Sequence, residues 1–178
     1  MTAATVLQEA GLKCAVIAEG LSLHEAPRAP FRGAGGTVLT GEKVKGGIFD
    51  DSRLCGVYTQ RLGGLLLQAD EFILATGKFF SRGLVADMDG IREPLFGLDV
   101  EYDEDRSTWT DPSFAASQRF LGFGLKTRDG LALKGGIAIE NLRPVGEILS
   151  GVDITVPGAE KLIRKSALDA AQAIINKR

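Results

Sequence analysis

The 178-residue sequence has little cysteine and almost no histidine. Its two cysteines, Cys14 and Cys55, do not stand in a CxxC spacing. They therefore do not support a disulfide scaffold, an iron–sulfur site or structural zinc, and no metal site is predicted. The one histidine, His24, lies in a polar stretch ahead of Pro27. We interpret it as a solvated loop residue, with a catalytic role as the alternative.

Long apolar runs and a strong net charge are also absent. No segment reaches the roughly 18 apolar residues that a membrane-spanning helix needs. The first residues do not combine a basic stretch with a sustained apolar run, so no secretory signal is expected. The formal net charge is −2, from 21 basic and 23 acidic residues, which disfavours a nucleic-acid partner. The cytoplasm is the expected compartment.

Glycine, in contrast, is abundant. There are 23 glycines among 178 residues, roughly 13% against a usual share of ~7%. They follow no collagen-like period and form no flexible linker, so we expect tight turns and close backbone approaches. The length fits one domain over residues 1–178.

Two strand endings suggest a ligand site. The segment 71–77 reads EFILATG, and the segment 139–147 reads IENLRPVGE. Open parallel sheets bind ligands at the carboxyl ends of their strands, where glycine lets the backbone approach and a carboxylate accepts hydrogen bonds. This pattern favours a dinucleotide or flavin site. The alternatives are an ordinary turn at 75–77 and a surface acid at Glu147. The predicted cofactor-binding residues of these endings are Ala75, Thr76, Gly77, Gly146 and Glu147.

The N-terminal region predicts the second half of a βαβ unit. Residues 2–10 have helical periodicity, and residues 13–20 form a short apolar strand that ends in Glu19. In such units the acid at this place accepts hydrogen bonds from the ribose of an adenine dinucleotide, so Glu19 is a further candidate. No strand and no GxGxxG loop precede the helix. The strand at 13–19 therefore has a potential open edge, which favours either pairing with another chain, as in a homo-oligomer, or an altered strand order.

The rest of the chain predicts four further parts. Two prolines in residues 26–30 indicate a connection. Short apolar runs at 37–39, 43–49, 54–60 and 65–69 suggest an antiparallel meander. Residues 78–134 show no clear periodicity and are predicted as an excursion over the sheet. Residues 158–177 predict a helix whose apolar face is formed by Leu162, Ile163, Ala167, Ala170, Ala171 and Ile174.

Two longer segments resemble a known family. FILATGKFFSRGLVADMDGIREPLFGLDV at 72–100 and IENLRPVGEILSGVD at 139–153 closely resemble the flavoprotein subunit, designated B, of anaerobic glycerol-3-phosphate dehydrogenases. More loosely, they resemble the glutathione-reductase-like flavoproteins. The resemblance implies an FAD or FMN cofactor at the candidate residues and an electron-transfer role. It also implies catalytic and membrane-anchor subunits as partners, with attachment at the inner membrane through them.

The resemblance also predicts the fold class. We expect an α/β, cut-down FAD/NAD(P)-binding-like domain of three layers. A central parallel sheet would contain strands near 13–19, 71–76 and 142–146, with helices on one side and the meander on the other. The apolar side chains of the excursion would line a pocket over the flavin or belong to the core. They are Phe79, Phe80, Ile91, Leu95, Phe96 and Leu98.

One departure from the family leaves a second function open. The family is more than twice as long, and its phosphate loop and middle region have no counterpart here. The chain reads as if a segment had been removed between His24 and Phe31. The alternative prediction is therefore a cofactor-free, truncated remnant that serves as a structural or subunit-interaction module.

Overall fold

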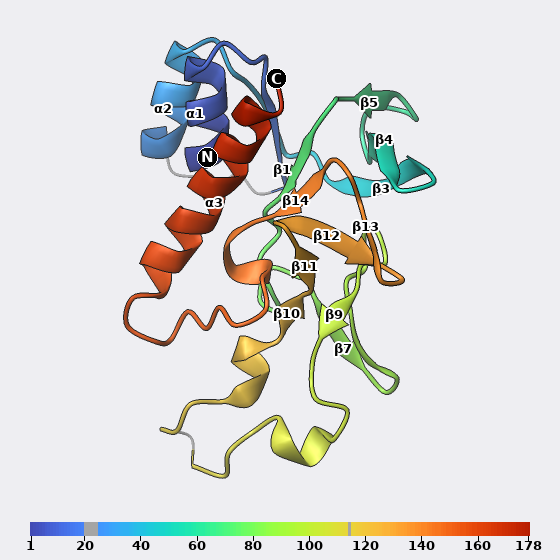
Figure 1. Cartoon of the computed structure of the whole chain (residues 1–178), viewed down its shortest axis with the longest axis vertical. Helices are drawn as coiled ribbons and strands as arrows, with labels where there is room; N and C mark the ends of the chain where they lie inside the picture. The colour runs from blue at the N-terminus through green and yellow to red at the C-terminus, as the bar shows by residue number, and fades with distance from the viewer. Residues whose placement is uncertain (20–24, 114) are drawn as a thin grey trace.

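The computed structural model describes residues 1–19, 25–113 and 115–178. His24 and Gly20 lie outside these residues. In Figure 1 the helices gather at one side of short parallel strands, the meander lies at the other side, and the segment between β7 and β10 lies below. This arrangement confirms the predicted α/β class with parallel and antiparallel pairing and flanking helices.

The elements follow one another along the chain in this order. They are α1 (Thr2–Glu9), β1 (Ala15–Ala18), α2 (Glu25–Gly33), β2 (Thr37–Thr40), β3 (Val44–Asp50), β4 (Arg53–Thr59), β5 (Leu66–Gln68), β6 (Phe72–Leu74), β7 (Val85–Asp87), β8 (Gly90–Arg92), β9 (Val100–Glu101), η1 (Arg106–Thr108), η2 (Arg119–Gly122), β10 (Gly124–Leu125), β11 (Thr127–Arg128), β12 (Leu131–Lys134), β13 (Ile137–Ala138), β14 (Leu142–Pro144), η3 (Gly146–Ile148) and α3 (Ala159–Asn176).

The parallel strands form two separate pairs. β6 pairs with β14, and β1 pairs with β2. The prediction of one central sheet that contains β1, β6 and β14 is therefore wrong. The run at 37–39 was expected in the meander, and this is also wrong, because it forms the parallel strand β2. A helical crossover, α2, separates β1 from β2, and such a crossover is what parallel pairing requires.

Residues 26–30 are helical, although two prolines predicted a connection. Proline lacks a backbone N–H group. In the first turn of a helix this loss costs no hydrogen bond, because the N–H groups there have no acceptor within the helix. Pro27 lies in that turn, and Pro30 lies inside the helix. The fully buried ring of Phe31 then anchors the helix. A Cβ atom at Gly36 would lie 2.3 Å from this ring, so glycine makes room for it.

The other three runs of the meander and the last helix form as predicted. β3, β4 and β5 are antiparallel in sequence order. α3 packs against α1 through a small cluster that contains Leu7, Ala171 and Ile174. Leu162 was expected on the same buried face, but it is 53% exposed. The first turn of α3 thus lies beyond the reach of α1, and the contact begins further along the helix.

The segment 78–134 contributes to the main core. Leu84, Ile91, Phe96, Leu98 and Leu125 are buried together with side chains from β4, β6 and β14. This segment therefore packs with the strands in one hydrophobic cluster. That it forms an excursion over the sheet stays a prediction. In the part of the chain that the structure describes, no helix is both long and apolar enough to cross a membrane.

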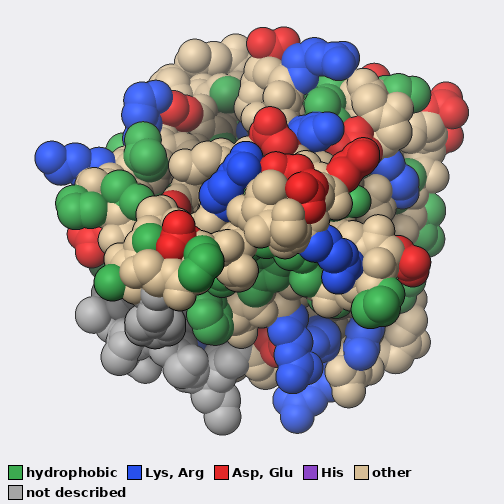
Figure 2. Space-filling model, turned by 90° about the horizontal axis from the view of Figure 1, so that it is seen from below, with side chains coloured by type: hydrophobic (Ala, Val, Ile, Leu, Met, Phe, Trp, Pro, Cys, Tyr) green, Lys and Arg blue, Asp and Glu red, His purple; other side chains and the backbone are tan. Residues whose placement is uncertain are grey.

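Opposite charges lie close together on the face seen from below. Acidic side chains gather near its centre, with lysine and arginine side chains around them (Figure 2). Asp103, in the acidic loop of residues 102–105, forms an ion pair with Arg119 at 3.3 Å. A hydrogen bond from Thr108 is the main cause that lowers the pKa of the Asp103 carboxyl. The acidic loop is therefore held by its own neighbours.

Candidate functional site

The two predicted strand endings leave the same end of one sheet. β6 and β14 are parallel, with Phe72 opposite Leu142 and Leu74 opposite Pro144. One further hydrogen bond, from the Val145 N–H to the Leu74 carbonyl at 2.9 Å, continues the pairing. Because parallel strands end at the same edge, residues 75–77 and 146–147 emerge side by side. The sheet thus brings five of the six candidate residues together.

Gly77 and Glu147 meet at this edge. Gly77 has a φ of 70°, which disfavours any residue with a side chain. A Cβ atom at Gly77 would lie 2.2 Å from Ser81 Oγ and 3.4 Å from Glu147 Oε2. The loop that follows is equally tight, because a Cβ atom at Gly83 would lie 2.0 Å from the Gly77 carbonyl oxygen. Glycine is therefore needed at both positions for the loop to fold back on the strand end.

Two polar groups at this edge have no hydrogen-bond partner among the described residues. Thr76 Oγ1 is buried and makes no hydrogen bond. The Glu147 side chain is half-buried, and no hydrogen bond or ion pair to it is found in the described part of the chain. A buried hydroxyl without a partner costs free energy. A ligand with hydroxyl groups at this edge would donate hydrogen bonds to the Glu147 carboxylate, which is in part open to solvent, whereas the Thr76 hydroxyl is covered by the loop at Gly83.

Gly146, in contrast, is bound to the last helix. Its φ is 82°, and its N–H donates to Ser166 Oγ at 2.9 Å. The Ser166 hydroxyl in turn donates to the Ile163 carbonyl at 2.8 Å. This N–H is thus not available to a ligand, and Gly146 instead attaches the strand end to α3. Sequence reasoning did not find Ser166, because a serine on a helix has no local sign of such a contact.

Lys78 is a second residue that sequence reasoning missed. It follows Gly77 directly, yet its side chain is only 7% exposed. Its Nζ donates to the Leu121 carbonyl at 2.7 Å and to the Val152 carbonyl at 2.5 Å. The lysine therefore ties two distant loops to the end of β6. The available signal was a lysine directly after a strand-end glycine and before two phenylalanines.

The surroundings of Lys78 alter its protonation. Burial lowers the pKa of its ammonium group from 10.5 to about 8, and the carboxylates of Asp153 and Glu147 oppose this shift. The negative charge of Glu147 therefore favours the charged form of Lys78, and it also lies at the shared end of β6 and β14. Beside Lys78 lies a cavity of about 20 Å³, which is room for one water molecule. Its walls include Phe79, Phe80 and Ile154.

Glu19 lies apart from the other five candidates. It follows β1, which belongs to the other parallel pair. Its carboxylate forms an ion pair with Lys43 at 2.7 Å, and its side chain is 62% exposed. Within residues 1–19, 25–113 and 115–178, no contact joins it to residues 75–77 or 146–147. The structure therefore does not gather the six candidate residues into one cluster.

The apolar residues of the excursion belong mainly to the core. Ile91, Phe96 and Leu98 are buried there, and Phe79 and Leu95 pack against it. Phe80 differs, because it is 88% exposed. Among the described residues, no three His, Cys, Asp or Glu side chains lie close enough together to hold a metal ion. The group that the edge offers to a ligand is therefore the half-buried Glu147 carboxylate.

Comparisons with known proteins show the family of this chain. The family model of the FAD binding domain matches residues 20–160. In Yersinia pestis bv. Antiqua, the subunit of anaerobic glycerol-3-phosphate dehydrogenase that is designated B is 38% identical over 159 residues, which are 88% of this chain and 38% of the relative. The corresponding protein of Vibrio cholerae is 39% identical over 142 residues, 78% of this chain and 33% of the relative. That of Aliivibrio fischeri strain MJ11 is 38% identical over 170 residues, with shares of 88% and 37%.

The resemblance predicted from residues 72–100 and 139–153 is confirmed by these relatives. The chain spans about 38% of the length of the Yersinia relative. The family model covers most of this chain and includes both strand endings. The chain therefore belongs to the FAD binding domain family.

Proposed function

We propose that this chain is a flavin-binding component of an oxidoreductase, with FAD held at the carboxyl ends of β6 and β14. One observation supports this most directly. In a chain of the FAD binding domain family, the half-buried Glu147 carboxylate has no hydrogen bond among the described residues and lies beside Gly77 at the shared end of β6 and β14.

The residues present fit one end of the cofactor. Glu147 would accept hydrogen bonds from the ribityl hydroxyls of the flavin. A bound flavin would itself take up and pass on electrons, so the protein needs to supply only orientation and electrostatics. The cavity beside Lys78 holds about 20 Å³, so the flavin ring would stay outside it. The buried ammonium group of Lys78 would add positive charge nearby.

The other end of the cofactor has fewer residues to hold it. No glycine-rich loop in the sequence leads into a helix, and such a loop is the usual pyrophosphate site. Glu19, the candidate for the adenine ribose, is paired with Lys43. We therefore expect the residues present to bind FAD more weakly than a domain that has such a loop, with FMN as the alternative cofactor.

The relatives are each named as one subunit of a dehydrogenase, and we propose partner subunits for this chain as well. A catalytic subunit would supply electrons, and a membrane-anchor subunit would receive them at the inner membrane, with this chain on the cytoplasmic side. The exposed side chains of Phe80 (88%) and Ile154 (47%) support a docking surface beside the candidate site. Co-purification of this chain with the catalytic and membrane-anchor subunits of such a dehydrogenase, when all three are produced in one host, would test the proposed partnership.

The same exposed side chains favour the second candidate function, a cofactor-free module that only binds other subunits. Open sheet edges add a further mode of association. Each parallel pair, β1–β2 and β6–β14, has just two strands among the described elements. Two copies of the chain that pair through these edges would form a homo-oligomer. In size-exclusion chromatography, its apparent molecular mass should rise with protein concentration.

One experiment separates the two functions. The purified chain is titrated with FAD and with FMN, while flavin fluorescence and the visible absorption of bound flavin are recorded. Saturable binding that weakens in Glu147→Gln supports the flavoprotein. A folded chain that binds neither flavin at millimolar concentration would leave the interaction module as the better account. Glu160→Gln, an exposed acid in the first turn of α3, is the matched control.

A further inference from the structure

Ser166, on the last helix, holds the backbone directly before the candidate cofactor carboxylate. Its hydroxyl accepts a hydrogen bond from the Gly146 N–H at 2.9 Å and donates one to the Ile163 carbonyl at 2.8 Å. Because the single hydroxyl proton is used toward the helix, the oxygen lone pairs are left for Gly146. Gly146 is buried and has a φ of 82°. Glycine alone restricts its backbone little, so this contact selects the conformation in which Glu147 leaves the strand end.

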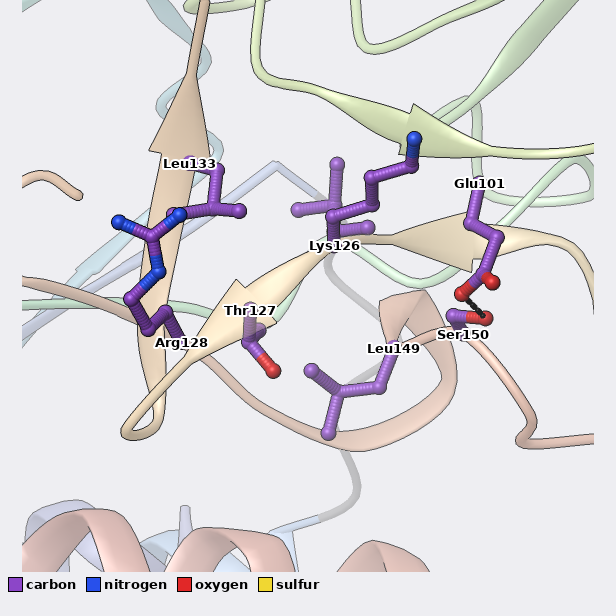
Figure 3. Close-up of a pocket in the computed structure, with 8 residues that line it drawn as sticks. Glu101, Lys126, Thr127, Arg128, Leu133, Leu149 and Ser150 are labelled. Atoms are coloured by element: carbon purple, nitrogen blue, oxygen red, sulfur yellow. Dashed lines mark hydrogen bonds between the residues drawn. The ribbon is translucent and has the colours of Figure 1, made fainter. Parts of the chain in front are cut away.

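The segment that follows the carboxylate is held independently of α3. Ile148 is fully buried in the main core, and Leu149 forms a parallel bridge with Leu125. The Ser150 hydroxyl donates to the Glu101 carboxylate at 2.6 Å. Figure 3 shows this bond at the side of a groove of about 520 Å³. The candidate carboxylate therefore lies between two attached points, of which only the hydroxyl contact comes from the last helix.

The contact with the helix begins where the sheet ends. Among the described residues, the hydrogen bonds that join β14 to β6 end with the Val145 N–H, and the next N–H, that of Gly146, is bound by Ser166. The Glu147 carboxylate then lies close to the other strand end, 3.4 Å from the Cβ position of Gly77. We propose that Ser166 is a positioning residue for the flavin, which sets through Gly146 the direction in which Glu147 projects toward the ribityl hydroxyls. The inference rests on the flavin site proposed above.

The ammonium group of Lys78 reports the place of the Glu147 carboxylate even without flavin. Burial lowers the pKa of Lys78 to about 8, and the charges of Asp153 and then Glu147 oppose this shift. Asp153 is held separately, because its carboxylate accepts hydrogen bonds from the Thr155 N–H at 2.8 Å and from the Thr155 hydroxyl at 2.6 Å. Its effect on Lys78 therefore stays constant when Glu147 moves. A carboxylate that loses its fixed direction would stabilise the charged form of Lys78 less.

The first test needs no flavin. The pKa of Lys78 is measured by NMR, from the ¹³C shift of its Cε atom, in the parent, Ser166→Ala and Glu147→Gln. We expect Ser166→Ala to lower this pKa toward the value in Glu147→Gln. The matched control is Ile174→Val, which removes one buried methylene group from the contact of α3 with α1 and leaves the Gly146 contact in place, so it should keep the parent pKa. An unchanged pKa in Ser166→Ala, or an equal fall in the control, would overturn the proposal.

The second test is the titration of the same variants with FAD. Ser166→Ala should lower FAD affinity about threefold to tenfold, because the loss cannot exceed what the Glu147 charge contributes. Ser166→Thr keeps a hydroxyl that can bond back to the helix, and it should restore most of the affinity, whereas Ile174→Val should bind as the parent does.

A double variant shows whether Ser166 acts through Glu147. In the Glu147→Ala background, Ser166→Ala should cause no further loss of FAD affinity, since residues that act through one interaction are not additive. Additive losses would overturn the positioning role and leave the flavin site standing. A parent chain that binds no FAD would instead contradict the proposed flavin site, and the Lys78 titration would then decide whether Ser166 directs Glu147.

Discussion

The side-chain amide of Asn141 pairs with the backbone of Leu54 as a neighbouring strand residue would. The Leu54 N–H donates to Asn141 Oδ1 at 2.9 Å, and Asn141 Nδ2 donates to the Leu54 carbonyl at 2.9 Å. A third bond, to the Asp70 carbonyl at 3.0 Å, reaches the segment before β6. Asn141 is fully buried. This one side chain therefore joins the meander to the parallel pair that positions the candidate site.

Replacement of Asn141 by leucine is expected to destabilise the protein strongly. It leaves two buried backbone groups, the N–H and the carbonyl of Leu54, without this partner, and each loss costs roughly 1–3 kcal/mol. We expect the free energy of unfolding in urea to fall by at least about 2 kcal/mol. Glu140→Gln changes only an exposed hydrogen bond with Ser52, and should alter it by less than about 0.5 kcal/mol. Similar stability of the two variants would show that the amide does not join the two parts.

Glu147 is expected to matter for the cofactor but not for the fold. Glu147→Gln keeps the shape and one acceptor, so FAD affinity should fall about tenfold, and Glu147→Ala should lower it further, since hydrogen bonds to a charged group are worth roughly 1.5–3 kcal/mol. The half-buried carboxylate has no hydrogen bond within the described residues and acts on the buried Lys78 ammonium through its charge alone, as the smaller of two such carboxylates, so the free energy of unfolding without cofactor should fall only slightly. Equal FAD affinity in all three proteins would remove Glu147 from the site. A large loss of stability would give it a structural role instead.

Lys78 should make stability rise with pH. Burial lowers the pKa of its ammonium group from 10.5 to about 8, so the unfolded chain binds more protons than the folded chain between these values. The cost of burying the charged form is full below pH 8 and is relieved as the pH rises. The free energy of unfolding should increase by up to roughly 1.4 kcal/mol per pH unit in this window.

The effect is measured as the difference in unfolding free energy between the parent and Lys78→Met, from urea titrations at several pH values. This subtraction cancels the titration of other groups. The difference should grow in favour of the parent from pH 8 to pH 10. Lys161→Met, at an exposed position on α3, should give a constant difference. A constant difference for Lys78→Met as well would mean that its ammonium group is not shifted.

Gly83 should not tolerate even alanine. A Cβ atom there would lie 2.0 Å from the Gly77 carbonyl oxygen and 2.8 Å from Thr76 Oγ1, so the loop would have to move. We expect a loss of about 2 kcal/mol or more in unfolding free energy, together with weaker FAD binding because the strand end shifts. Gly122→Ala is the control, since no atom lies within 4 Å of its Cβ position. Equal behaviour of the two alanine variants would contradict the tight packing of this loop.

Several features could be predicted because they depend on neighbours in the sequence. The run 72–74 is apolar and stops at Gly77, and the structure has a strand and a left-handed glycine there. The periodicity of residues 158–177 gave a helix in the correct place. Turn residues separated the strands of the meander correctly. In each case the local backbone preference and the apolar pattern agree, so tertiary contacts had nothing to override.

Other local signals were misleading. Two prolines at positions 27 and 30 suggested a connection, but the buried ring of Phe31 stabilises a helix there. The run 37–39 has the pattern of any short strand, and only the crossover through α2 makes it parallel to β1. Propensity describes what a segment prefers when isolated. Burial of one large side chain is enough to outweigh that preference over a few residues.

The sequence by itself determined the family, the strand endings and the residue types of the candidate site. Only the tertiary structure decided how they are used. It placed Glu147 beside Gly77, left Glu19 with Lys43 on a separate strand pair, buried Lys78 between two loops and paired Asn141 with Leu54. The physical reason is that a polar side chain forms hydrogen bonds with whichever segment of the polypeptide packs beside it in the folded protein. Residues 54 and 141 become neighbours only when the core assembles.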